Sequence, residues 1–152
     1  MTLAHAETAG IRAKLAGLAK RIESGLQRVL ENAVAAAEQV ARATTAWKDG
    51  TKPGARTRSS IRHSLRGPLS GFVTAAGAAK FLEYGTRPHT ITARRAKMLR
   101  FVQGGVVRFA RTVHHPGTKP THFMRDAAEL VRPIFLRNSV ATVNNAIENF
   151  NR

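Results

Sequence analysis

The chain has 152 residues, no cysteine and a formal net charge of +16. This length suits one domain with a real core, and the absence of cysteine excludes disulfides and a zinc site built on thiolates. No stretch approaches the roughly 20 apolar residues of a membrane span, and the N-terminus has no signal-peptide core, so we expect a soluble intracellular protein without membrane contact.

The first predicted element is a long amphipathic helix, about Thr8 to Ala46, within the segment 1–47. Its apolar residues recur at steps of three and four, which places them on one helical face. At 1.5 Å per residue the helix would span roughly 58 Å and overhang a compact core. We therefore expect the helix to bend, or a neighbouring subunit to cover part of its stripe. The candidate interface residues are Leu15, Leu18, Ile22, Leu26 and Val29.

A loop follows over residues 48–58. Its Gly, Pro and basic residues predict an exposed, flexible segment, with candidate partner contacts at Lys48, Lys52, Arg56 and Arg58. Trp47, just before this loop, is expected to pack the helix end onto the sheet.

Residues 59–120 form the predicted sheet region. Alternation on both sides of Gly67-Pro68 indicates one β-hairpin, and two β-rich runs around Gly104-Gly105 indicate a second. Between them, a short helix is predicted to end at Gly85, a residue that adopts positive φ at little cost. Six aromatic residues are expected at core positions: Phe72, Phe81, Tyr84, Phe101, Phe109 and Phe123.

A C-terminal helix is predicted over residues 121–149, with Thr121 as its cap. Pro133 is expected to kink or divide it, and its polar end is expected to fray. The chain is thus predicted to be a single α+β domain, residues 1–152. It consists of a long N-terminal helix, a small antiparallel or mixed β-sheet with a short inserted helix, and a C-terminal helix.

The positive charge is concentrated in the middle of the chain. Gly50 to Asp126 holds 15 Lys or Arg against 2 acidic residues, whereas the segments before and after it have net charges of only +2 and +1. Such a block predicts a surface for a polyanion, either nucleic acid or an acidic protein, and the charge alone does not choose between them.

The sequence contains no residue pattern that is typical of a catalytic, metal or phosphate-binding site. Adjacent His114 and His115 point to opposite sides of an extended chain, and neither cysteines nor clustered acids are present to complete a metal site. No phosphate-binding glycine motif occurs, and Glu83 is the single acidic residue between Asp49 and Asp126. We therefore expect no catalytic residues, no cofactor and no metal.

Two segments, AKFLEYGTRPHTI and HHPGTKPTHFMRDA, carry the most specific signal in the chain. Together they resemble the neck and tail-completion family of long-tailed bacteriophages, which includes minor tail protein Z-like components. The resemblance covers Ser59 to about Leu136. The residues that carry the motifs or the turns between them are Phe81, Glu83, Tyr84, Gly85, Thr86, Pro88, His114 (or His115), Pro116, Gly117, Thr118, Lys119 and Phe123.

This resemblance implies a non-enzymatic virion protein at the head–tail junction, made in the host cytoplasm and acting as a ring or as an assembly factor. The family implies six or twelve copies and contacts with head-closure, tail-terminator or tail-tube proteins, and with DNA in the lumen as a further candidate. The alternative is a small basic nucleic-acid-binding architectural protein.

The echo between GTRP and GTKP is interpreted as two turns of similar chemistry packed side by side. Gly85 and Gly117 would lie where the chain turns sharply, and Thr86 and Thr118 would hydrogen-bond to backbone. Glu83 would accept hydrogen bonds from loop N–H groups or from an arginine.

Overall fold

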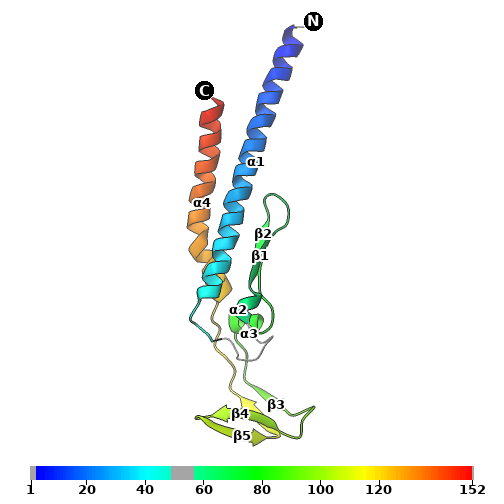
Figure 1. Cartoon of the computed structure of the whole chain (residues 1–152), viewed down its shortest axis with the longest axis vertical. Helices are drawn as coiled ribbons and strands as arrows, with labels where there is room; N and C mark the ends of the chain where they lie inside the picture. Colours follow the sequence, from blue (N-terminus) through cyan, green and yellow to red (C-terminus); the bar gives the residue numbers. More distant parts are fainter. Residues whose placement is uncertain (1–2, 49–56, 152) are drawn as a thin grey trace.

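Two long helices form the body of the molecule. The computed structural model describes residues 3–48 and 57–151. Helix α1 (Leu3–Ala43) and helix α4 (Phe123–Phe150) lie side by side and antiparallel, and the first turns of α1 extend beyond the end of α4 (Figure 1). The predicted long helix and its overhang are confirmed. Across the described ranges, no helix is long and apolar enough to span a membrane.

A β-hairpin lies against these helices. Strands β1 (Arg62–Leu65) and β2 (Gly71–Thr74) pair antiparallel, as predicted around Gly67-Pro68, and the one-turn helix α2 (Thr57–Ser60) precedes them. Gly71 allows the close approach to α1, because a Cβ there would be 2.9 Å from a methyl carbon of Val34.

A carboxylate on α1 fastens the hairpin. One Glu38 oxygen lies 2.8 Å from the backbone N of His63 and 2.6 Å from its Nδ1, and the other lies 2.9 Å from Nε of Arg42. These interactions, those with His63 first, lower the pKa of Glu38 from its ordinary value of 4.5.

The core lies where the short helix α3 (Ala79–Tyr84) meets the C-terminal end of α1 and the N-terminal end of α4. It contains Trp47 and Phe123, whose rings meet edge to face with centroids 5.5 Å apart. The cluster is completed by Ala41, Ile61, Ala79 and Ala127. Trp47 is therefore buried in the core as expected, although the aromatic ring that it meets belongs to α4 and not to a strand.

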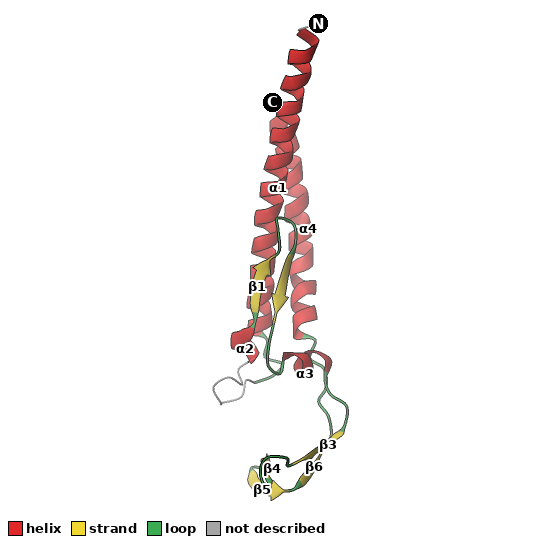
Figure 2. Ribbon diagram, turned by 90° about the vertical axis from the view of Figure 1, so that its right-hand side faces the viewer, coloured by secondary structure: helices red, strands yellow, loops and turns green. Residues whose placement is uncertain are grey.

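The remaining strands project away from the helices as a separate arm, which we define as residues 87–116 (Figure 2). Strand β3 (His89–Thr92) pairs with β6 (Thr112–His115), and β4 (Leu99–Gln103) pairs with β5 (Val106–Ala110) around the predicted Gly104-Gly105 turn. The predicted α+β class is confirmed. Among the described residues, however, the expected small sheet takes the form of three separate antiparallel pairs.

Helix α4 departs from its prediction in two respects, because Pro133 does not divide it and its polar end is helical. Helix α4 continues undivided through Pro133, which is exposed, so the carbonyl that it leaves without a donor can bond to water. The polar end of the helix is helical as far as Phe150, since α4 runs along α1 and Thr142 packs against Gly25.

The prediction that six aromatic residues are core positions is also wrong in part. Phe123 is buried, but Phe81, Tyr84 and Phe109 are among the exposed large side chains. Aromatic character does not specify burial when a segment has no second layer to pack against.

Candidate functional site

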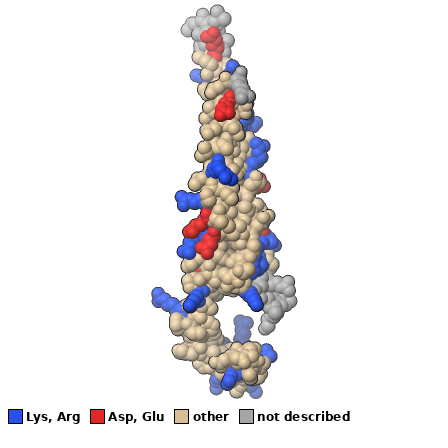
Figure 3. Space-filling model, turned by 90° about the vertical axis from the view of Figure 1, so that its left-hand side faces the viewer, with Lys and Arg blue, Asp and Glu red and all other residues tan. Residues whose placement is uncertain are grey.

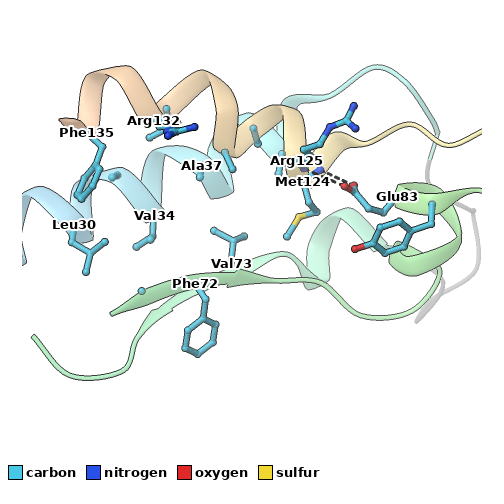
Figure 4. Close-up of a pocket in the computed structure, with 17 residues that line it drawn as sticks. Leu30, Val34, Ala37, Phe72, Val73, Glu83, Met124, Arg125, Arg132 and Phe135 are labelled. Atoms are coloured by element: carbon cyan, nitrogen blue, oxygen red, sulfur yellow. Dashed lines mark hydrogen bonds between the residues drawn. The ribbon is translucent and has the colours of Figure 1, made fainter. Parts of the chain in front are cut away.

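Glu83 joins α3 to the start of α4. Its side chain is 8% exposed, and its two oxygens accept hydrogen bonds from the backbone N of Met124 at 2.8 Å and of Arg125 at 3.2 Å (Figure 4). The first N–H groups of a helix have no partner within the helix, and the helix dipole favours a negative charge there. Glu83 therefore caps α4 from a distance of about forty residues in sequence.

The predicted cap, Thr121, has another task. Its hydroxyl donates to the carbonyl of Leu82 at 2.8 Å, and its backbone N bonds to the same carbonyl. The residue at the cap position is His122, which has a φ of 51° and no capping side-chain bond. The assignment of Thr121 as cap is therefore wrong. Its hydroxyl donates to a carbonyl near the end of α3, and the Glu83 carboxylate accepts the hydrogen bonds from the first turn of α4.

The two Gly-Thr turns lie against each other, as the sequence predicts. Thr86 and Thr118 form an antiparallel bridge, with backbone N···O distances of 3.0 and 3.2 Å and hydroxyl oxygens 3.1 Å apart. Gly85 and Gly117 have φ values of 70° and 87°. A Cβ on Gly117 would lie 2.3 Å from the Thr86 carbonyl oxygen, and one on Gly85 would lie 2.5 Å from that of Thr118, so both turns require glycine.

Other motif residues surround this paired turn without joining it. Pro88, Pro116 and Lys119 are exposed, and the His114 ring lies on β6 with its Nδ1 3.0 Å from the Thr90 hydroxyl. His115 is the histidine that contacts the turn, because its Nδ1 accepts from the Gly117 N–H at 3.0 Å. The sequence left His114 and His115 as alternatives, and the spacing of two residues to the glycine was the signal that could have selected His115.

An apolar groove opens beside this junction, between α1, α4 and the β1–β2 hairpin. Its volume is about 580 Å³, and Figure 4 shows Val73 pointing toward the helices while Phe72 points to the opposite face of β2. The backbone-bonded Glu83, Arg125 and Arg132 are the charged residues along it. No sequence pattern predicts the groove, since it depends on how three elements far apart in the chain pack together.

The proposed basic contact loop is only partly described. Lys48 is exposed, and Lys52 and Arg56 lie outside the described residues. Arg58 is turned inward: its guanidinium donates to the carbonyls of Arg42, Thr44 (2.7 Å) and Trp47 (3.1 Å) and lies over the Trp47 ring. Arg58 is therefore a structural residue that satisfies carbonyls at and beyond the end of α1, and its expected role as an exposed contact is wrong.

The candidate interface stripe on α1 divides into two parts. Leu18, Ile22, Leu26 and Val29 are half-buried along the stretch that runs beside α4, so the chain itself covers part of their surface. Leu15, nearer the free end, is 50% exposed, and Ile11, one turn before it, is 57% exposed. The uncovered apolar surface on α1 therefore lies toward its N-terminal end.

The arm concentrates positive charge. Its Lys and Arg side chains are all exposed, the segment contains no Asp or Glu, and none of these cations forms an ion pair with a described residue. Figure 3 shows acidic side chains over the helical body, whereas the charged side chains visible on the arm are basic. The seven cations are Arg87, Arg94, Arg95, Lys97, Arg100, Arg108 and Arg111.

The histidines at the base of the arm do not form a metal centre. His89 and His115 face each other across β3 and β6 with ring centroids 5.0 Å apart, and each Nδ1 is already bonded to backbone. Within residues 3–48 and 57–151, no group of three or more His, Asp or Glu side chains could hold a metal ion.

Comparison of the chain with protein-family models, with curated proteins and with solved structures finds no match.

Proposed function

We propose that this chain is a structural, non-enzymatic protein of the head–tail junction of a long-tailed phage particle. In this proposal it forms or joins a ring of six or twelve copies that connects the tail to the head. The observation that carries the proposal is the meeting of the two motifs that resemble the neck and tail-completion family. Glu83, Gly85 and Thr86 from the first lie directly against Thr118 and the start of α4 from the second.

The surface of the chain is consistent with a subunit that is completed by neighbours. Ile11 and Leu15 leave apolar surface uncovered near the free end of α1, and a helix face of this kind gains a partner when the next subunit packs against it. A heterologous contact that closes on itself produces a ring. The arm extends from the opposite end of the body, where it can reach a neighbouring ring (Figure 1).

The first experiment measures the native mass of the nuclease-treated protein by light scattering, at low and high salt. We expect a discrete assembly of six or twelve copies that Ile11→Ser with Leu15→Ser converts to monomer. Ala9→Ser with Ala13→Ser is the matched control on the opposite side of the helix and should leave the assembly intact. If the two double variants have the same native mass, α1 is not the ring interface.

A second experiment addresses the role in the particle directly. In a bacterial strain that carries this gene beside particle genes, deletion should leave filled heads and complete tails unjoined, as seen by electron microscopy. Supplying the chain from a plasmid should restore joined particles. Normal joined particles from the deletion strain would refute the proposed function.

The basic arm also favours the second candidate, a nucleic-acid-binding architectural protein. Seven exposed cations without a compensating acid would attract phosphates. Under this alternative the isolated monomer binds duplex DNA, and the logarithm of its affinity falls steeply with the logarithm of salt concentration. Weak DNA binding at physiological salt, together with the unjoined phenotype, would exclude it.

A further inference from the structure

The arm has an apolar face that nothing in the described chain covers. In the β4–β5 pair, Val102 lies opposite Val107 and Arg100 lies opposite Phe109. Since alternate residues of a strand point to opposite faces, these four side chains share one face of the ribbon. All four are exposed, with Val102 and Phe109 both 62% exposed. We call this set, Arg100, Val102, Val107 and Phe109, the docking face.

The other face of the same ribbon is different in kind. It carries Leu99, Phe101 and Ala110, which are half-buried, together with Gln103, Val106 and Arg108. Leu99 and Phe101 are therefore partly covered on this face, where Val106 beside the turn is exposed, whereas all three apolar side chains of the docking face are exposed. A two-stranded ribbon without a second layer is marginally stable in water, so covering the open face would also stabilise the arm.

We propose that the docking face binds an acidic protein surface that offers apolar side chains between its carboxylates. Val102, Val107 and Phe109 would bury apolar area, and an aromatic residue beside an arginine is the combination enriched where interface energy is concentrated. The arm contains no acid and its cations are unpaired within the described residues, so carboxylates of the partner would complement its charge.

Two other occupants fit less well. Nucleic acid would satisfy the cations and could stack one base on Phe109, but Val102 and Val107 offer no ring, and burying them against phosphates would strip the phosphates of water. A second copy of this chain has a net charge of +16, and its helix α4 has no net negative charge to offer the arm. An acidic partner is the one that uses both the apolar and the basic side chains.

This inference rests on the proposed function only in identifying the partner with a neighbouring ring of the particle. The chemistry of the docking face is tested separately. Failure of the binding assay below would leave the ring mass and the unjoined-particle phenotype unaffected. A monomeric mass or normal particles would likewise leave the preference of the docking face intact.

The test uses the full chain and three labelled probes at physiological salt, with binding measured by fluorescence anisotropy. One probe is a peptide in which Glu alternates with Leu, the second is a peptide of equal charge in which Glu alternates with Ser, and the third is a short DNA duplex. We expect the Leu peptide to bind at least about tenfold more tightly than the Ser peptide, and more tightly than the duplex.

A pair of matched variants assigns this preference to one face. Val102→Ser should abolish it, and Phe109→Ser is a second variant of the same face. Val106→Ser should retain the preference, because Val106 is 59% exposed on the same ribbon but lies on the opposite face. Circular dichroism spectra and native masses that match those of the wild type check that the variants are folded.

Several outcomes would overturn the inference. Equal binding of the two peptides, or no measurable binding of the Leu peptide at about 1 mM, would show that the apolar side chains contribute nothing. Loss of the preference in Val106→Ser as well would remove the face assignment. Tighter binding of the duplex would identify nucleic acid as the ligand of the arm. Self-association that is lost only in Val102→Ser would identify a second copy of the chain as the ligand.

Discussion

Replacing Glu83 with alanine removes the acceptor that caps α4 and leaves two backbone N–H groups unsatisfied, those of Met124 and Arg125. A hydrogen bond to a charged group contributes about 1.5–3 kcal/mol, and the two bonds share one carboxylate, so we expect a loss of about 3 kcal/mol. A domain of this size has a total stability of about 5–15 kcal/mol. The substitution should therefore lower the melting temperature by about 10 °C.

Circular dichroism monitors unfolding by urea, which gives the free energy, and by heat, which gives the melting temperature. Hydrogen exchange is measured at the paired turns. Because Glu83 joins α3 to α4 just before the paired turn of Thr86 and Thr118, the amides of Thr86 and Thr118 should exchange faster in Glu83→Ala. Glu129→Ala is the control: this carboxylate lies on α4 with its side chain 70% exposed and 3.8 Å from Arg125, and its loss should cost less than about 1 kcal/mol. If Glu83→Ala costs no more than Glu129→Ala and leaves both amides protected, the capping argument is refuted.

Two further predictions concern backbone conformation and pH. Gly117→Ala should lose at least about 2 kcal/mol more than Gly77→Ala in urea unfolding, because both glycines have positive φ but only at Gly117 would the new Cβ overlap a carbonyl oxygen; equal losses would show that the paired turn can shift. The lowered pKa of Glu38 means that its ionised form stabilises the folded state, so this contribution is full above pH 4.5 and is lost as the pH falls through the folded-state pKa. The difference in urea midpoint between wild type and Glu38→Gln should accordingly shrink between pH 7 and pH 3, and a constant difference would contradict this assignment.

Local patterns predicted the elements that depend on local chemistry. The spacing of apolar residues indicated α1, and its observed bounds of Leu3–Ala43 differ from the predicted ones by a few residues at each end. Gly104-Gly105 indicated the β4–β5 turn and Gly85 the end of α3, because positive φ is a property of the single residue. The similar sequences of the Gly-Thr segments indicated two similar turns, and the bridge between Thr86 and Thr118 shows that these turns lie side by side.

What the sequence could not show depends on distant elements meeting. The cap of α4 comes from Glu83 on another helix, so a search for a capping residue beside Phe123 selected Thr121. Strand β3 is short and polar, and it is defined by its pairing with β6. The inward turn of Arg58 requires Trp47 and the end of α1 as partners, and none of these contacts is visible in the composition of the loop.

The bridge between Thr86 and Thr118 means that the chain leaves the body and returns to it at the same place. Residues 87–116 are thus an insertion whose two ends are held a strand spacing apart, and the entropy of closing such a loop changes only slowly with its length. We therefore expect that the arm can be lengthened, trimmed or exchanged without altering the path of α1, α3 or α4. The sequence between the two glycines could therefore diverge, or be replaced by a different ribbon, while the bridge that holds its ends stays the same.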